Sequence, residues 1–86
     1  MSSEGKILVV EDEPNISEVV RLYLEHSSFE VVQLFRGGDV LKTIVNERPS
    51  LVLLDIMLPD LSGYELCELI RKMDAPHHHT PIIFLT

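Results

Sequence analysis

The sequence predicts an α/β fold in which helices cover both faces of a doubly wound parallel sheet. Short aliphatic runs, rich in β-branched residues, alternate along the chain with segments whose apolar residues recur at helical spacing. The aliphatic runs lack the polar alternation of a half-exposed strand, which indicates strands that are buried on both faces. Short connections from strand to helix to strand then favour parallel pairing.

The first half of the chain is expected to form two strands with a helix between them. The run KILVV at residues 6–10 predicts a strand, and FEVVQLF at residues 29–35 predicts the next. Between them, Asn15 and Glu18 stand at the spacing of a capping box, which predicts a helix over residues 15–28. Its expected inner face consists of apolar residues at helical spacing: Ile16, Val19, Val20, Tyr23 and Leu24.

A second helix and a third strand are expected next. After the turn signal RGGD, Asp39 can cap a short helix, and Pro49 ends it. The apolar residues at helical spacing in this segment are Val40, Leu41, Ile44 and Val45. The run SLVLL at residues 50–54 predicts the third strand, which leads directly into Asp55.

The last expected elements are a third helix and a fourth strand. Ser62 and Glu65 form another capping box, which predicts a helix start. The inner face of this helix is expected to contain Leu66, Leu69, Ile70 and Met73. PIIFLT at residues 81–86 predicts a strand with proline at its entry, where proline is tolerated. The predicted order is therefore β-α-β-α-β-α-β.

Composition limits the functional classes. The 86 residues allow one domain, and 14 acidic against 7 basic residues give a net charge of −7, which argues against nucleic-acid binding by this segment. No apolar run approaches the roughly 20 residues that span a bilayer, and the first residues lack a signal-peptide core. Cys67 is the only cysteine, so an intrachain disulfide is impossible. We expect a cytoplasmic protein without direct membrane contact.

Acidic side chains follow two of the predicted strands. Glu11 and Asp12 come after the first strand and Asp55 after the third, while Thr86 stands at the end of the fourth. Because the carboxyl ends of parallel strands share one edge of the sheet, we expect these side chains to converge there. Clustered carboxylates repel one another unless a cation lies among them, and a set of oxygen ligands suits Mg²⁺.

This arrangement predicts phosphoryl transfer to Asp55. With Mg²⁺ cancelling the repulsion between two anions, one oxygen of Asp55 can attack an incoming phosphoryl group in line and form an acyl phosphate. The hydroxyl of Thr86 and nearby backbone N–H groups can donate hydrogen bonds to the phosphoryl oxygens.

Three segments in order, ILVVEDEPN, LVLLDIMLPDLSGYEL and PIIFLT, resemble the receiver domain of two-component response regulators. The resemblance implies a flavodoxin-like fold and names Asp55 as the phosphoacceptor. It also implies that Glu11, Asp12, Asp55 and the main-chain carbonyl of Met57 surround Mg²⁺, and that Thr86 is the switch hydroxyl. The implied partners are a sensor histidine kinase, which donates from a phosphohistidine, and an output domain or protein that responds to phosphorylation.

The resemblance also implies elements that do not occur in these 86 residues. Receivers continue through further helices and a fifth strand that carries a lysine for the phosphoryl group. We therefore expect residues 1–86 to be the N-terminal part of a single receiver domain, with the last helices and the fifth strand missing. The fourth strand would then be a free sheet edge, through which two copies could form a homodimer.

Other functions fit the residues less well. An aspartyl-phosphate phosphatase needs a second acid two residues after the nucleophile, and Met57 occupies that position. A nucleotide-binding domain would have a glycine-rich loop after the first strand, where this chain has EDEP. We therefore do not expect an enzyme. His77, His78 and His79 point in different directions and do not suggest one compact metal site. A receiver-like interaction module without phosphorylation stays open as the alternative.

Overall fold

The computed structural model describes residues 4–85, and this part of the chain folds into four strands and three α-helices in strict alternation. The strands are β1 (Lys6–Val10), β2 (Glu30–Leu34), β3 (Leu51–Leu54) and β4 (Ile82–Phe84). The helices are α1 (Pro14–His26), α2 (Val40–Glu47) and α3 (Gly63–Arg71), with a short 3₁₀ helix at His77–His79 before β4. The predicted element order is confirmed.

The strands form one parallel sheet in the order β2-β1-β3-β4. In its register, Val10 lies opposite Leu34 on one side and Leu54 on the other, while Leu54 lies opposite Phe84. The last residues of the four strands therefore stand in one row. Whatever follows each strand begins at the same edge of the sheet, and this row positions the site described below.

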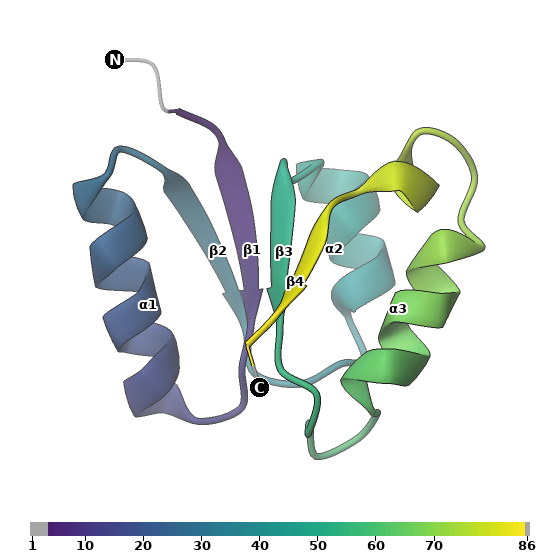
Figure 1. Cartoon of the computed structure of the whole chain (residues 1–86), viewed down its shortest axis with the longest axis horizontal. Helices are drawn as coiled ribbons and strands as arrows, with labels where there is room; N and C mark the ends of the chain where they lie inside the picture. Colours follow the sequence, from purple (N-terminus) through teal and green to yellow (C-terminus); the bar gives the residue numbers. More distant parts are fainter. Residues whose placement is uncertain (1–3, 86) are drawn as a thin grey trace.

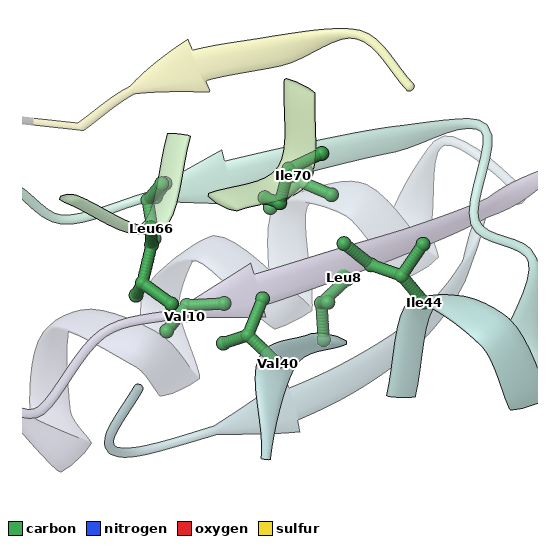
Figure 2. Close-up of a cluster of buried hydrophobic side chains, with 8 residues drawn as sticks. Leu8, Val10, Val40, Ile44, Leu66 and Ile70 are labelled. Atoms are coloured by element: carbon green, nitrogen blue, oxygen red, sulfur yellow. The ribbon is translucent and has the colours of Figure 1, made fainter. Parts of the chain in front are cut away.

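Helices cover both faces of the sheet, as expected for a doubly wound fold. Figure 1 shows α1 on one side of the sheet and α2 and α3 together on the other. The main core lies between the sheet and the pair α2 and α3, where aliphatic side chains from strands and helices meet (Figure 2). Its fully buried members are Leu8, Val10, Val40, Ile44, Val52, Leu54, Leu66 and Ile70.

The start of α1 differs from the prediction. The helix begins at Pro14, and Glu13 is its N-cap, with the Glu13 side chain accepting a hydrogen bond from the backbone N–H of Asn15 at 3.4 Å. The expected capping box of Asn15 and Glu18 is therefore wrong. Proline suits the first helical position because its fixed φ is already helical and its missing N–H has no helical partner there.

The buried face of α1 also differs. The fully buried residue is Ser17, and of the predicted face Val20 and Leu24 are half-buried, whereas Ile16 and Val19 are exposed and Tyr23 is 74% exposed. The Ser17 hydroxyl accepts a hydrogen bond from Nε2 of Gln33 on β2 at 2.8 Å. A small residue with a polar partner on the sheet therefore lies at the centre of the buried side of α1, and only the part of the apolar stripe at Val20 and Leu24 is partly buried.

The capping box of α3 is confirmed. The Ser62 side chain accepts the backbone N–H of Tyr64 at 3.1 Å, and the Glu65 side chain accepts that of Ser62 at 3.3 Å. Leu69, expected on the inner face, is exposed, and so is Val45 on α2. None of the helices within residues 4–85 is long and apolar enough to cross a membrane.

Candidate functional site

The strand ends place three acidic residues at one edge of the sheet. The hydrogen-bond ladder continues one residue past the strands: Glu11 N–H donates to the carbonyl of Leu34 at 3.0 Å, and Asp55 N–H donates to that of Val10 at 2.9 Å. The backbone of both residues is thus held by the central strands. Asp12 follows Glu11 before α1 begins.

The three carboxylates come close together. One oxygen from each of Glu11, Asp12 and Asp55 can be chosen so that all three lie within 4.8 Å of one another. Glu11 is 5% exposed and Asp55 is 8% exposed, whereas Asp12 is open to solvent. Within residues 4–85 this is the one group of three acidic, histidine or cysteine side chains close enough to hold a metal ion. The predicted convergence of these carboxylates is confirmed.

This crowding has an electrostatic cost. The pKa of Glu11 is raised from 4.5 to about 7. The first cause is burial, which disfavours its charged form, and the second is the neighbouring Asp55 carboxylate, whose hydrogen bond with Glu11 favours the protonated form. Asp12 acts in the same direction, and the backbone N–H of Glu13, which donates to Oε2 of Glu11 at 3.3 Å, partly offsets it. The site therefore favours binding a positive charge, whether a proton or a metal ion.

The loop after Asp55 orients its side chain. The backbone N–H of Met57 donates to Oδ1 of Asp55 at 3.2 Å. The N-terminus of α3 packs against this segment, with Gly63 N–H donating to the carbonyl of Ile56 at 2.7 Å. A Cβ on Gly63 would stand 2.4 Å from the carbonyl oxygen of Asp55, which no real contact allows. Glycine is thus required for α3 to lie this close to the phosphoacceptor candidate.

Met57 and Thr86 are the other two residues of the predicted site. The side chain of Met57 is 80% exposed, so its hydrophobicity is not used in the core. The proposed role of its main-chain carbonyl as a metal ligand stays a prediction. Thr86 lies outside the residues that the structure describes, and its predicted role as the switch hydroxyl also stays a prediction.

Asp60 makes a contact next to the site that the sequence does not indicate. Oδ1 of Asp60 accepts the backbone N–H of Gly37 at 2.7 Å, and Oδ2 lies 3.8 Å from Nε of Arg36. This joins the loop after β3 to the loop after β2. An acid beside Pro59 signals only a turn, and no local pattern indicates a partner 23 residues away.

Comparison with known proteins identifies the family. The family model of the response regulator receiver domain matches residues 7–86. The chain belongs to the response regulator receiver domain family. It is 43% identical over 83 residues to the uncharacterized transcriptional regulatory protein YkoG of Bacillus subtilis, and 40% identical over 90 residues to the transcriptional regulatory protein GltR of Pseudomonas aeruginosa. These matches cover 96% and 100% of this chain but only 35% and 36% of the relatives.

Solved receiver structures have the same fold. The N-terminal domain of a response regulator receiver protein from Methanoculleus marisnigri superposes with a TM-score of 0.90 at 36% identity, covering 98% of this chain and 68% of that one. The BeF3-activated receiver domain of RstA from Klebsiella pneumoniae gives 0.79 at 38% identity, covering 92% and 64%. The resemblance stated from the three sequence segments and the flavodoxin-like receiver fold are confirmed. This receiver domain is a module of two-component signalling.

Proposed function

We propose that this receiver is phosphorylated on Asp55 by a sensor histidine kinase, with Mg²⁺ bound in the acidic pocket, and that phosphorylation switches an output. The observation that carries the proposal is the buried Asp55 carboxylate, which lies at the carboxyl edge of the sheet within 4.8 Å of the Glu11 and Asp12 carboxylates. Membership in the response regulator receiver domain family supports it.

The residues present suit Mg²⁺. The pocket offers only oxygen ligands, and its open side at Asp12 leaves room for water, which Mg²⁺ keeps in its coordination shell. Burial, and then the neighbouring Asp55 carboxylate, raise the pKa of Glu11, so a cation at this position would stabilise its charged form. We propose that Glu11, Asp12, Asp55 and the main-chain carbonyl of Met57 surround the ion, which would neutralise the carboxylates and an oxygen of the phosphoryl group.

The transfer step is nucleophilic substitution at phosphorus. Met57 N–H donates to Oδ1 of Asp55, which restrains the carboxylate, and one of its oxygens would attack the incoming group. That oxygen forms the new O–P bond while the P–N bond to the donor imidazole breaks, and the imidazole departs with the electron pair of that bond. The product is an acyl phosphate on Asp55. Thr86 would donate its hydroxyl to a phosphoryl oxygen.

The relatives suggest the wider context. YkoG and GltR are named as transcriptional regulatory proteins, and this chain spans about a third of their length. We propose that residues 1–86 are the N-terminal part of a single receiver domain that acts in the cytoplasm and controls an output of the same kind, with no nucleic-acid contact by this segment. Homodimer formation through the edge strand β4 stays a prediction.

Intact mass after incubation with Mg²⁺ and a small acyl phosphate tests the phosphoryl transfer. We expect a hydroxylamine-labile phosphoryl adduct on the unchanged chain and none on Asp55→Asn. Asp39→Asn is the matched control, because Asp39 is an exposed acid that makes no capping hydrogen bond, and this variant should carry the adduct.

The absence of a phosphoryl adduct on a longer chain would contradict the proposal. If a longer chain that includes the fifth-strand lysine of the family carries no adduct, the proposal is wrong. The alternative, a receiver-like interaction module without phosphorylation, would then be the better description.

A further inference from the structure

The loop after β3 is closed on itself and fixed at its inner end. This β3–α3 loop, residues 55–62, contains an antiparallel bridge between Met57 and Ser62. Next to the bridge, Gly63 N–H donates to the carbonyl of Ile56 at 2.7 Å, and Met57 N–H donates to Oδ1 of Asp55 at 3.2 Å. The position of Met57 therefore depends on the position of Ser62, on the opposite side of the loop.

Asp60 fixes the outer end of the same loop. Its Oδ1 accepts Gly37 N–H at 2.7 Å, and its side chain is only 23% exposed. The β2–α2 loop that supplies this N–H, residues 35–39, belongs to the far edge strand of the sheet. The contact therefore connects the Asp55 loop to a strand end on the other side of β1.

The partner loop is itself tightly packed. A Cβ on Gly37 would lie 2.9 Å from Cδ1 of Leu66 and 3.2 Å from Cβ of Leu61, so the β2–α2 loop lies close against the core and the β3–α3 loop. The N–H that Asp60 accepts thus belongs to a residue in close contact with Leu61 and Leu66. A carboxylate that accepts from a backbone N–H makes one of the stronger hydrogen bonds in proteins. The Asp60–Gly37 hydrogen bond therefore joins the β3–α3 loop to a closely packed residue of the β2–α2 loop.

We infer that Asp60 is a positioning residue for the acidic pocket: by holding the β3–α3 loop against Gly37, it keeps the Met57 main chain in place beside Asp55. This inference rests on the proposed function, since the Met57 carbonyl matters to the metal only if the pocket binds one. Asp60 itself does not belong to the group of three carboxylates. Its effect passes through the bridge between Met57 and Ser62, since Asp60 lies three residues after Met57 and two residues before Ser62.

The test compares two substitutions of Asp60 in the 86-residue chain. Asp60→Ala removes the acceptor, and we expect Mg²⁺ binding to weaken about tenfold, the lower end of what is typical when a group supporting a metal ligand is lost. Asp60→Asn keeps an acceptor oxygen of the same reach without the charge, so its Mg²⁺ affinity should stay within about twofold of the unchanged chain. Titration calorimetry measures each.

Charge and stability need their own controls. Asp39→Asn removes an exposed acid from the neighbouring β2–α2 loop and should leave Mg²⁺ affinity unchanged. If Asp60→Asn and Asp60→Ala weaken binding equally, the effect is one of charge and the inference is wrong. It is equally wrong if neither variant changes the affinity.

A readout without metal separates this inference from the proposed function. In EDTA, amide hydrogen exchange at Met57 should be faster in Asp60→Ala than in the unchanged chain and normal in Asp60→Asn. If the unchanged chain does not bind Mg²⁺, the proposed pocket fails, while Met57 exchange still decides whether Asp60 positions the loop. Unaltered exchange in Asp60→Ala would overturn the inference.

Discussion

Glu11 is the acidic residue of the pocket whose pKa is raised. It is nearly buried, it lies next to two other carboxylates, and its backbone is held by the carbonyl of Leu34 on β2. The backbone of Glu11 cannot leave this position without breaking the end of the sheet ladder. Burial and repulsion must therefore be relieved by protonation or by a cation, because a buried ionised carboxylate without a partner is strongly unfavourable.

The raised pKa of Glu11 predicts an unusual dependence of stability on pH in the metal-free protein. The pKa of Glu11 is near 4.5 in the unfolded chain and about 7 in the folded chain, so the folded state binds more protons between pH 4.5 and pH 7. The contribution of Glu11 to the unfolding free energy is therefore fully present below pH 4.5 and is lost as the pH rises through 7. Urea unfolding in EDTA between pH 5 and 8 should show stability falling across this window.

The control for this titration is Glu11→Gln, which has no proton to lose. Its unfolding free energy should change less between pH 5 and 8 than that of the unchanged chain. A fall of equal size in both proteins would assign the pH dependence to other groups and contradict the prediction.

At the residue scale, the sequence indicates groups that follow strands but not contacts between loops. Glu11, Asp12 and Asp55 were predictable because parallel strand ends share an edge, and this depends only on the element order. The contact of Asp60 with Gly37 depends on how two loops pack over Leu66, which no local pattern records.

The N-terminus of α3 is the element that fits most tightly against the pocket. Ser62 and Glu65 satisfy the first N–H groups of the helix, so its start is fixed by a complete capping box. Directly after the cap, Gly63 brings the helix backbone against Asp55 and Ile56. The helix start and the acceptor are therefore coupled through one residue without a side chain.

We expect Gly63→Ala to lower the unfolding free energy by about 1–3 kcal/mol, the usual cost of forcing an extra methyl into a packed site. The new Cβ would stand 2.4 Å from the Asp55 carbonyl oxygen and 2.8 Å from Cα of Ile56, and both are backbone atoms that cannot turn aside. Gly38→Ala is the milder comparison and should lose less stability, because its nearest neighbour is a side-chain oxygen, that of Asp60 at 3.3 Å, and not a backbone atom. Equal stability of the two variants by urea unfolding would contradict this account.

Element boundaries and orientations were predictable to different degrees. The α3 capping box was correct because both of its hydrogen bonds are local to four residues. The rotation of α1 was not, because two apolar neighbours such as Ile16 and Val19 define a face only when the sheet offers a surface to match. There Ser17 lies on the buried side and accepts a hydrogen bond from Gln33, a contact between residues 16 apart that no local pattern indicates.

Across the whole molecule, the core and the pocket make opposite demands on the central strands. The side chains of β1 and β3 that face α2 and α3 are fully buried aliphatics, which make the sheet rigid. The same two strands end in Glu11 and Asp55, whose charges add to a net charge of −7. The apolar framework thus holds the carboxylates in a repulsive arrangement that an unsupported loop would relax.

This opposition predicts that Mg²⁺ stabilises the folded chain, since the folded state alone assembles the pocket. At a concentration ten times the dissociation constant, one such site adds about 1.4 kcal/mol to the unfolding free energy. Urea unfolding at pH 7.5 with and without Mg²⁺ measures the effect. At pH 5 the increment should shrink, because protons compete for the same carboxylates and Glu11 titrates at about 7.

Two variants make the Mg²⁺ prediction specific. Asp55→Asn should be more stable than the unchanged chain in EDTA, because one repelling charge is gone, and should gain little from Mg²⁺. Asp39→Asn lies outside the pocket and should respond to Mg²⁺ as the unchanged chain does. A full Mg²⁺ response in Asp55→Asn would mean that the ion binds elsewhere, and the strand-end carboxylates would then be a source of instability without a ligand.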